Sequence, residues 1–162
     1  MIQGESTGIV IKLREYLASL KMPTQKAPQE VIIEVLMMLL PSIEELQRIQ
    51  WRNNQLSTGE LMGDYSPLTI KRYNKRQSKI NLKETGELYD SVSATIDLST
   101  DDMFKIEIDS PRYERDYINL GFNSKIGFKE NGEPKFLGLT PENTSFIMTM
   151  FYEELRKRGY TL

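Results

Sequence analysis

Two short segments in which apolar and polar residues alternate constrain the fold more than any other feature of this chain. Every second residue is apolar over 92–98, and the same alternation recurs over 104–109. A period of two is typical of a strand with one buried face. Residues 99–102 form a connection of hairpin length, so we expect the two segments to pair as an antiparallel hairpin.

The end of the chain carries the signals of a helix. Thr140 is a suitable N-terminal cap, Pro141 suits the first helical position, and Gly159 follows the expected last turn. The apolar residues expected on its buried face are Phe146, Ile147, Met150, Phe151 and Leu155. Together with the hairpin, this helix predicts an α+β fold, an antiparallel sheet of about three or four strands packed by a C-terminal helix.

Helical periodicity dominates the N-terminal third. Residues 8–20 have apolar side chains at spacings of three and four, and a second such stretch runs from Pro28 to about residue 50. Because Pro41 interrupts helical hydrogen bonding, we expect either a kink or two helices meeting near residue 40, and the acids after Ser42 favour two helices. The apolar run 37–40 is interpreted as core, with a seam against another subunit as the alternative.

Composition divides the chain into three parts. We expect an N-terminal helical arm over 1–57, a polar and basic connector over 58–81, and an α+β domain over 82–162. A long connector without strong periodicity is usually functional or mobile. Within it, residues 67–75 are predicted to form one or two helical turns.

The residue types present limit the chemistry. The 162 residues include no cysteine and no histidine, which removes thiol nucleophiles, the usual zinc sites and the best proton shuttle near neutral pH. The acidic pair Asp101 and Asp102 lies at the predicted hairpin turn, where solvated carboxylates are expected. We therefore predict no enzyme activity, cofactor, metal or small-molecule substrate, and the apolar window 31–40 is too short for a membrane span.

One basic cluster stands out against a net charge of only −2. Charge runs of this kind are most often solvated or inter-subunit faces, and the alternative is a local DNA-binding module over 71–79 that contacts phosphates. Its members are Lys71, Arg72, Lys75, Arg76 and Lys79, with Tyr65 and Tyr73 interleaved.

Residues 82–91 read Leu-Lys-Glu-Thr-Gly-Glu-Leu-Tyr-Asp-Ser and precede the hairpin, a tyrosine-containing segment at 117–121 and a Lys-Phe-Leu-Gly-Leu-Thr phrase at 135–140. This order resembles the virion-morphogenesis and tail-completion (neck) proteins of tailed bacteriophages. Residues 52–56 and 63–69 resemble the lead-in of relatives from phages and prophages of Bacteroides-type hosts. An arginine that often precedes the Pro-Phe-Leu phrase is not found at the same spacing here.

The resemblance implies a structural subunit at the neck or tail-completion region, part of a ring at the head-tail joint. Its partners would be further copies of itself and other neck and tail proteins, with genomic DNA as a non-specific contact left open. It would be made in the host cytoplasm and reside in the virion. The residues expected to maintain this fold are Leu82, Thr85, Gly86, Leu88, Ser91, Gly121, Phe136, Leu137, Gly138 and Leu139.

The residue types in these phrases favour structure over chemistry. Gly86 can adopt a backbone turn forbidden to other residues, and Thr85 can hydrogen-bond locally to hold it. Leu82 and Leu88 are expected to flank the turn as packing anchors. Gly138 is expected to permit a sharp approach to the cap at Thr140.

Overall fold

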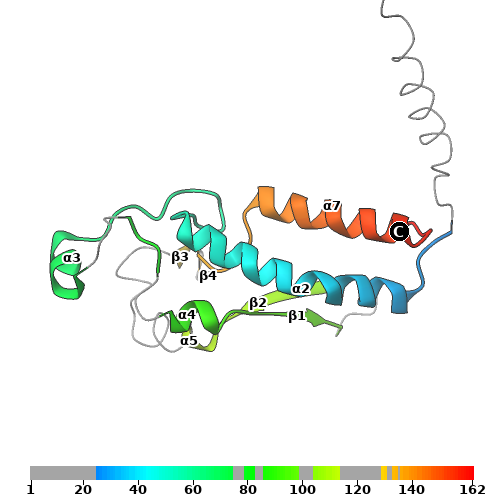
Figure 1. Ribbon diagram of the computed structural model, residues 1–162, viewed down its shortest axis with the longest axis horizontal. Helices are drawn as coiled ribbons and strands as arrows, with labels where there is room; N and C mark the ends of the chain where they lie inside the picture. Colours follow the sequence, from blue (N-terminus) through cyan, green and yellow to red (C-terminus); the bar gives the residue numbers. More distant parts are fainter. Residues whose placement is uncertain are drawn as a thin grey trace, which may run out of the picture.

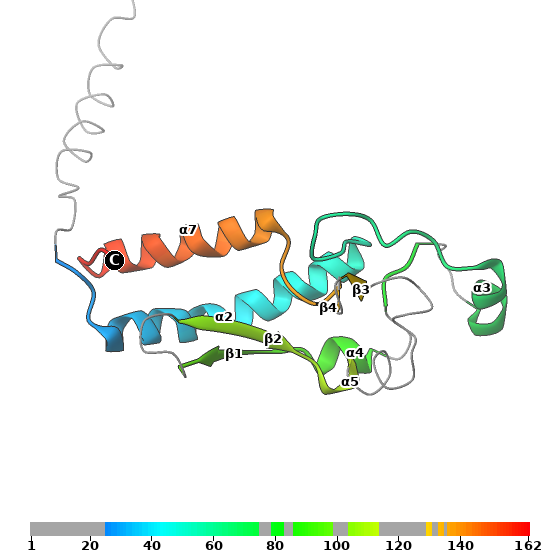
Figure 2. The ribbon, with the colours of Figure 1, turned by 180° about the vertical axis from the view of Figure 1, so that it is seen from behind.

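The computed structural model describes residues 25–74, 79–82, 86–98, 104–113, 129–130, 133–134 and 136–162. A long central helix, α2 (Gln29–Arg52), organises this part of the chain. Helix α7 (Pro141–Lys157) lies antiparallel along one side of α2, and a β-hairpin lies along the other side (Figures 1 and 2). Helix α7, helix α2 and the hairpin thus form three layers, with α2 in the middle.

The helix α2 is continuous through Pro41, so the expectation of two helices is wrong. Pro41 lies on the exposed side, while Leu39 and Ile43 on either side of it are buried. Proline removes one helical hydrogen bond. Packing of the apolar stripe on both sides of Pro41 offsets that loss. Local sequence signals for a helix break carry no information about this packing.

The predicted C-terminal helix is confirmed, including its cap. The hydroxyl of Thr140 accepts a hydrogen bond from the Asn143 N–H at 3.2 Å, and Pro141 is the first helical residue. Ile147, Phe151 and Leu155 are buried at spacings of four. Phe146 lies one position off this stripe and is 55% exposed, so its expected burial is wrong.

The predicted hairpin is confirmed as β1 (Ser93–Asp97) and β2 (Lys105–Asp109), which pair antiparallel from Ser93 opposite Asp109 to Asp97 opposite Lys105. A second, very short pair consists of β3 (Lys129–Glu130) and β4 (Glu133–Pro134). Within the described ranges these are two separate two-stranded sheets, so a single sheet of three or four strands is not confirmed.

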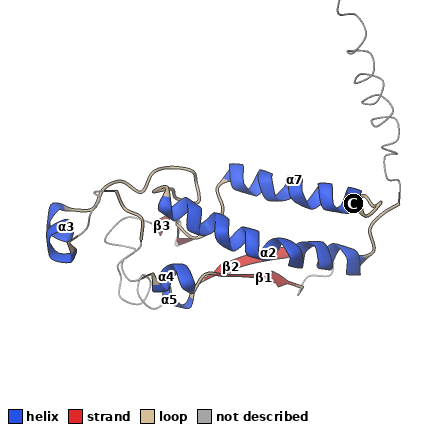
Figure 3. Ribbon diagram, viewed as in Figure 1, coloured by secondary structure: helices blue, strands red, loops and turns tan. Residues whose placement is uncertain are grey.

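Three short helices complete the described elements: α3 (Pro67–Tyr73), α4 (Glu87–Asp90) and α5 (Pro111–Tyr113). Figure 3 shows that α3 projects at one end of the molecule, beyond the end of α2, whereas α4 and α5 lie beside the base of the hairpin. The helical turns predicted within the connector correspond to α3.

Buried side chains form two clusters. The helical cluster joins α2, α7 and β1, and the tryptophan cluster surrounds the C-terminal end of α2. Members of the helical cluster are Val35, Leu36, Leu39, Ile43, Ala94, Ile147, Phe151 and Leu155. Members of the tryptophan cluster are Trp51, Leu56, Met62, Ile80, Leu82, Leu88, Tyr89, Val92 and Phe136.

These clusters correct the expected N-terminal arm. Helix α2 packs against α7 on one side and β1 on the other, so residues 29–52 are part of the core and do not form an arm. The division at residue 57 likewise does not separate α2 from the C-terminal region. The other predicted helix of the arm, residues 8–20, lies outside the described residues.

A short backbone bridge fastens the start of the described chain to its end. Lys26 and Thr161 form an isolated parallel bridge, in which the Ala27 N–H donates to the Thr161 carbonyl at 2.7 Å and the Thr161 N–H to the Gln25 carbonyl at 2.9 Å. Close by, Arg158 of the α7 end pairs with Glu34 of α2 at 2.8 Å. The two ends of the described chain therefore lie together.

Candidate functional site

Three side chains from the last turns of α2 bind the backbone of residues 136–140. The indole N–H of Trp51 donates to the Phe136 carbonyl at 2.7 Å, and the Gln47 amide donates to the same oxygen at 3.1 Å. Gln47 Oε1 accepts from the Gly138 N–H at 2.7 Å. We call this set of contacts, together with those of Gln50, the glutamine clamp.

Gln50 extends the clamp to the start of α7. Its amide donates to the Gly138 carbonyl at 2.9 Å, and its oxygen accepts from the Thr140 N–H at 2.8 Å and from the Asn143 side chain at 2.7 Å. The clamp thus contacts the backbone at every second residue, at 136, 138 and 140, as a neighbouring strand does. Both glutamine side chains are fully buried.

Complete hydrogen bonding explains why polar side chains are tolerated at these positions. A buried amide without partners costs about 1–3 kcal/mol, whereas Gln47 and Gln50 each use both their donor and their acceptor groups. Sequence reasoning missed the clamp. A usable signal exists, because positions 47 and 50 continue the buried stripe of Leu39 and Ile43 at helical spacing.

Asn54 closes the base of the following loop. It has a positive φ of 62° just after α2 and is buried. Its side-chain amide donates to the carbonyls of Gly63 and Ile80, and its oxygen accepts from the Gly63 N–H at 3.2 Å. The Ile80 N–H donates to the Gly63 carbonyl at 3.0 Å, so one asparagine holds both ends of the 63–80 excursion together.

Gly86 of the Thr-Gly phrase has the positive backbone angle that its residue type allows. Gly86 caps α4 with φ of 90°, and Leu82 and Leu88 are both buried in the tryptophan cluster. The hydroxyl of Ser91 donates to the Leu88 carbonyl at 3.0 Å. The Ser91 hydroxyl also lies 2.6 Å from the Ser110 hydroxyl. Leu82 itself has φ of 55°, which the sequence did not indicate. Thr85 and Gly121 lie outside the described residues.

The Phe-Leu-Gly-Leu phrase lies between the two clusters. Phe136 is fully buried in the tryptophan cluster, with Leu137 packed against that cluster and Leu139 packed against the helical cluster. Gly138 has φ of 118°, and a Cβ there would lie 3.4 Å from the Cβ of Ser57. The expected sharp approach to Thr140 is confirmed, and the glutamine clamp holds it.

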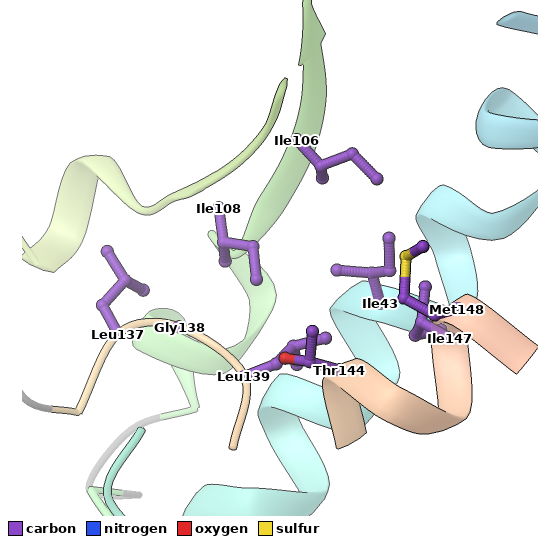
Figure 4. Close-up of a pocket in the computed structure, with 9 residues that line it drawn as sticks. All are labelled: Ile43, Ile106, Ile108, Leu137, Gly138, Leu139, Thr144, Ile147 and Met148. Carbon is purple, nitrogen blue, oxygen red and sulfur yellow. The ribbon is translucent and has the colours of Figure 1, made fainter. Parts of the chain in front are cut away.

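An open apolar groove lies where this phrase meets β2, α2 and α7, and Figure 4 shows the side chains around it. Its volume is about 430 Å³. The lining side chains are aliphatic except for the exposed Thr144, and none of them is charged. They belong to Ile43, Ile106, Ile108, Leu137, Gly138, Leu139, Thr144, Ile147 and Met148.

The basic cluster is carried by the projecting α3 loop, residues 64–79. An isolated bridge between Asp64 and Lys79 closes the base of the loop, and the Ser66 hydroxyl caps α3 by accepting from the Thr69 N–H at 3.1 Å. Lys71, Arg72 and Lys79 are exposed. Lys75 and Arg76 lie outside the described residues, so the full cluster is not placed.

Charged side chains elsewhere form pairs on the surface. Hydrogen bonds, first to Glu34 and then to Glu154, raise the pKa of Arg158 above its ordinary value. In the described part of the chain, no three acidic side chains are placed to hold a metal ion together. The helices placed in the structure include none that is both long enough and apolar enough to cross a bilayer.

The candidate features of the described structure are therefore a clamped motif, an apolar groove and a basic projecting loop. The motif residues Leu82, Leu88 and Phe136 are brought together in one cluster, whereas Lys71 and Arg72 lie apart from them on α3. Comparison of the chain with protein-family models, with curated proteins and with solved structures gives no match.

Proposed function

We propose that this chain is a structural subunit of a tailed-phage virion, acting at the neck or tail-completion region within a ring at the head-tail joint. The order of motifs described above supports the phage setting. The observation that supports assembly with other subunits is the apolar surface left exposed around the core, chiefly the groove beside α7. Exposed apolar patches on soluble proteins often mark protein contacts.

Further apolar side chains are exposed on both long helices. Met37 and Met38 of α2 are more than half exposed, and so is Phe146 of α7. The motif residues support the same function in another way, since the clamp and the Gly86 turn hold a fixed shape and present no reactive group. A subunit that recognises its neighbours by shape needs this rigidity.

Purified particles test the proposal directly. Virions from an induced host that carries the gene are banded in a density gradient, and their proteins are quantified by mass spectrometry. The proposal predicts this chain at a fixed ratio to the other structural proteins, and cryo-electron microscopy should locate it at the head-tail joint. Particles that contain no copy of the chain would exclude the proposed function.

The basic α3 loop favours a second candidate, a local DNA-binding module. Residues 64–79 contain five basic side chains and one acid, although the whole chain is net negative. The loop also projects away from the core, and Lys71 and Arg72 are exposed on it. Such a loop would contact phosphates without reading sequence.

Binding to random duplex DNA distinguishes this candidate. We expect weak affinity that falls with salt, and Lys71→Gln with Arg72→Gln should reduce the salt slope by roughly 1–2, about 0.9 per lost phosphate contact. Arg156→Gln with Lys157→Gln at the far end of α7 is the control. Absence of binding at low salt would exclude the DNA-binding candidate and leave the assembly proposal intact.

A further inference from the structure

We propose that the apolar groove binds residues 8–20 of a neighbouring copy of this chain, so that each subunit inserts its N-terminal segment into the next. The inference rests on the proposed assembly function and names the contact that makes the ring. The acceptor is the groove, and the donor is the part of the chain that precedes the described residues.

The groove has the chemistry to accept an apolar helix face. Ile106 of β2, Ile43 of α2 and Leu139 lie on different sides of it, as Figure 4 shows. Its volume is about 430 Å³, so it can take apolar side chains of a bound helix and not the whole helix. Because its lining holds no charged side chain, apolar side chains are the matching ligand.

The N-terminal segment has the matching pattern. Ile9, Leu13, Tyr16, Leu17 and Leu20 stand at positions i, i+4, i+7, i+8 and i+11. This is the spacing of anchors by which an amphipathic helix binds a hydrophobic groove. The intervening positions include the charged residues Lys12, Arg14 and Glu15, which suit the solvated side of such a helix.

The position at which this segment joins the domain favours a neighbour's groove. Gln25 is fixed beside Thr161, at the C-terminal end of α7, whereas Thr144 and Met148 place the groove near the first turns of α7. The helix between Thr144 and its end is about 20 Å long at 1.5 Å per residue. A segment that fills its own groove must run back along α7 over that length, whereas a neighbour arranged head to tail can place its groove where the segment leaves the domain.

Different donor and acceptor surfaces also give the required symmetry. A contact between two unlike surfaces repeats from one copy to the next and closes into a ring when the rotation allows it. A single kind of contact, segment into groove, therefore suffices for a ring.

Full-length variants test each half of the contact. The donor variant carries Leu13→Glu and Leu17→Glu, and the acceptor variant carries Met148→Glu at a side chain that is 41% exposed and therefore tolerant of substitution. Each should weaken self-association by about 100-fold or more, because an unpaired carboxylate is strongly disfavoured in an apolar contact. Leu68→Glu on α3 is the control, since Leu68 is 75% exposed and lies outside the groove.

Mixing the two variants identifies the neighbour as the recipient. The donor variant keeps an intact groove and the acceptor variant keeps an intact segment, so an equal mixture should form one-to-one heterodimers in sedimentation velocity. Far-ultraviolet circular dichroism spectra at low temperature should match that of the unaltered chain for all variants, which shows that each variant is folded.

Other outcomes overturn the inference. A mixture that stays monomeric, while the unaltered chain assembles, shows that the segment does not cross between copies. Variants that assemble normally show that another surface forms the ring, and the proposed function then survives. If the unaltered chain neither self-associates nor occurs in particles, both the inference and the proposed function fail.

Discussion

The two core clusters are built from different kinds of contact. In the helical cluster, α2 and α7 pack aliphatic and aromatic side chains against each other and against Ala94 of β1. In the tryptophan cluster, Trp51 makes edge-to-face contacts with Tyr89 and Phe136, and much of the surrounding chain has no regular structure. Polar side chains of α2 hold that irregular chain in place through its backbone.

The two clusters should differ in how much their stability depends on side-chain hydrogen bonds. Packing between regular elements needs little help from side-chain hydrogen bonds, because the elements satisfy their own backbone groups. Residues 136–140 have no such ladder in the described structure, and Gln47 and Gln50 supply partners for their backbone groups. Residues 54–63 make a few backbone hydrogen bonds of their own, and Asn54 adds side-chain hydrogen bonds to Gly63. The tryptophan cluster should therefore depend on a few side chains more than the helical cluster does.

Trp51→Ala should have the largest effect. Removing a fully buried indole and its hydrogen bond to Phe136 should cost about 3–5 kcal/mol in the free energy of unfolding. Phe151→Ala in the helical cluster is the matched comparison and should cost a similar amount. Chemical denaturation measures both losses.

Hydrogen exchange then separates the two clusters. In Trp51→Ala, the amides of Met62 and Ile80 should lose protection before those of α2 and α7. Equal loss of protection in both regions would show that the clusters unfold as one unit.

Gln47→Leu tests the clamp with nearly unchanged size. The Gly138 N–H loses its acceptor, and we expect a loss of about 1–3 kcal/mol despite the more apolar side chain. Met37→Leu on the exposed side of the same helix should change stability by less than about 0.5 kcal/mol. A Gln47→Leu variant as stable as the parent would mean that the clamp contributes nothing.

Gly86→Val tests the turn that leads into α4. The space around Gly86 is open, since the nearest atom to an added Cβ is Asp90 Oδ2 at 4.0 Å. The expected loss of about 1–2 kcal/mol therefore comes from the positive backbone angle alone. Gly86→Asn should cost less because asparagine tolerates that angle, and Ser93→Ala on the exposed side of β1 is the control. A thermal melt of Gly86→Val that matches Ser93→Ala contradicts this account.

Thr140→Val should have the smallest effect. It keeps the shape of the side chain but removes the hydroxyl that caps α7, which should cost about 1 kcal/mol. Thr140→Ser keeps the hydroxyl and should restore most of the loss in urea denaturation. Equal stability of the two variants would show that the Gln50 contact to the Thr140 N–H is sufficient to hold the helix start.

Sequence patterns predicted the parts of the fold that depend on local contacts. The hairpin and α7 follow from alternation, helical spacing and capping residues within one segment. Helix α2 was predicted as helical and residues 37–40 as core, but Met37 and Met38 are exposed. The packing of α2 between α7 and the hairpin was not predicted. Its second buried side meets Ala94, about fifty residues away, and no local pattern reports such a contact.

The candidate site shows the same limit. The Gly86 and Gly138 geometries follow from residue type, because few other residues adopt such backbone angles. The glutamine clamp joins positions almost ninety residues apart, and glutamine in a helix is ordinary on any exposed face. The groove is likewise a product of tertiary packing, formed by four segments whose meeting no local pattern indicates.

The bridge between Lys26 and Thr161 has a mechanical consequence. A load applied to the chain before Gln25 reaches α2 only through residues 25–28, which are also tied to Thr161 by two backbone hydrogen bonds. Tension is thus divided between α2 and α7, which are already coupled by their packed faces and by the Arg158 pair with Glu34. A pull on the chain before Gln25 therefore acts on both long helices at once and not on α2 alone.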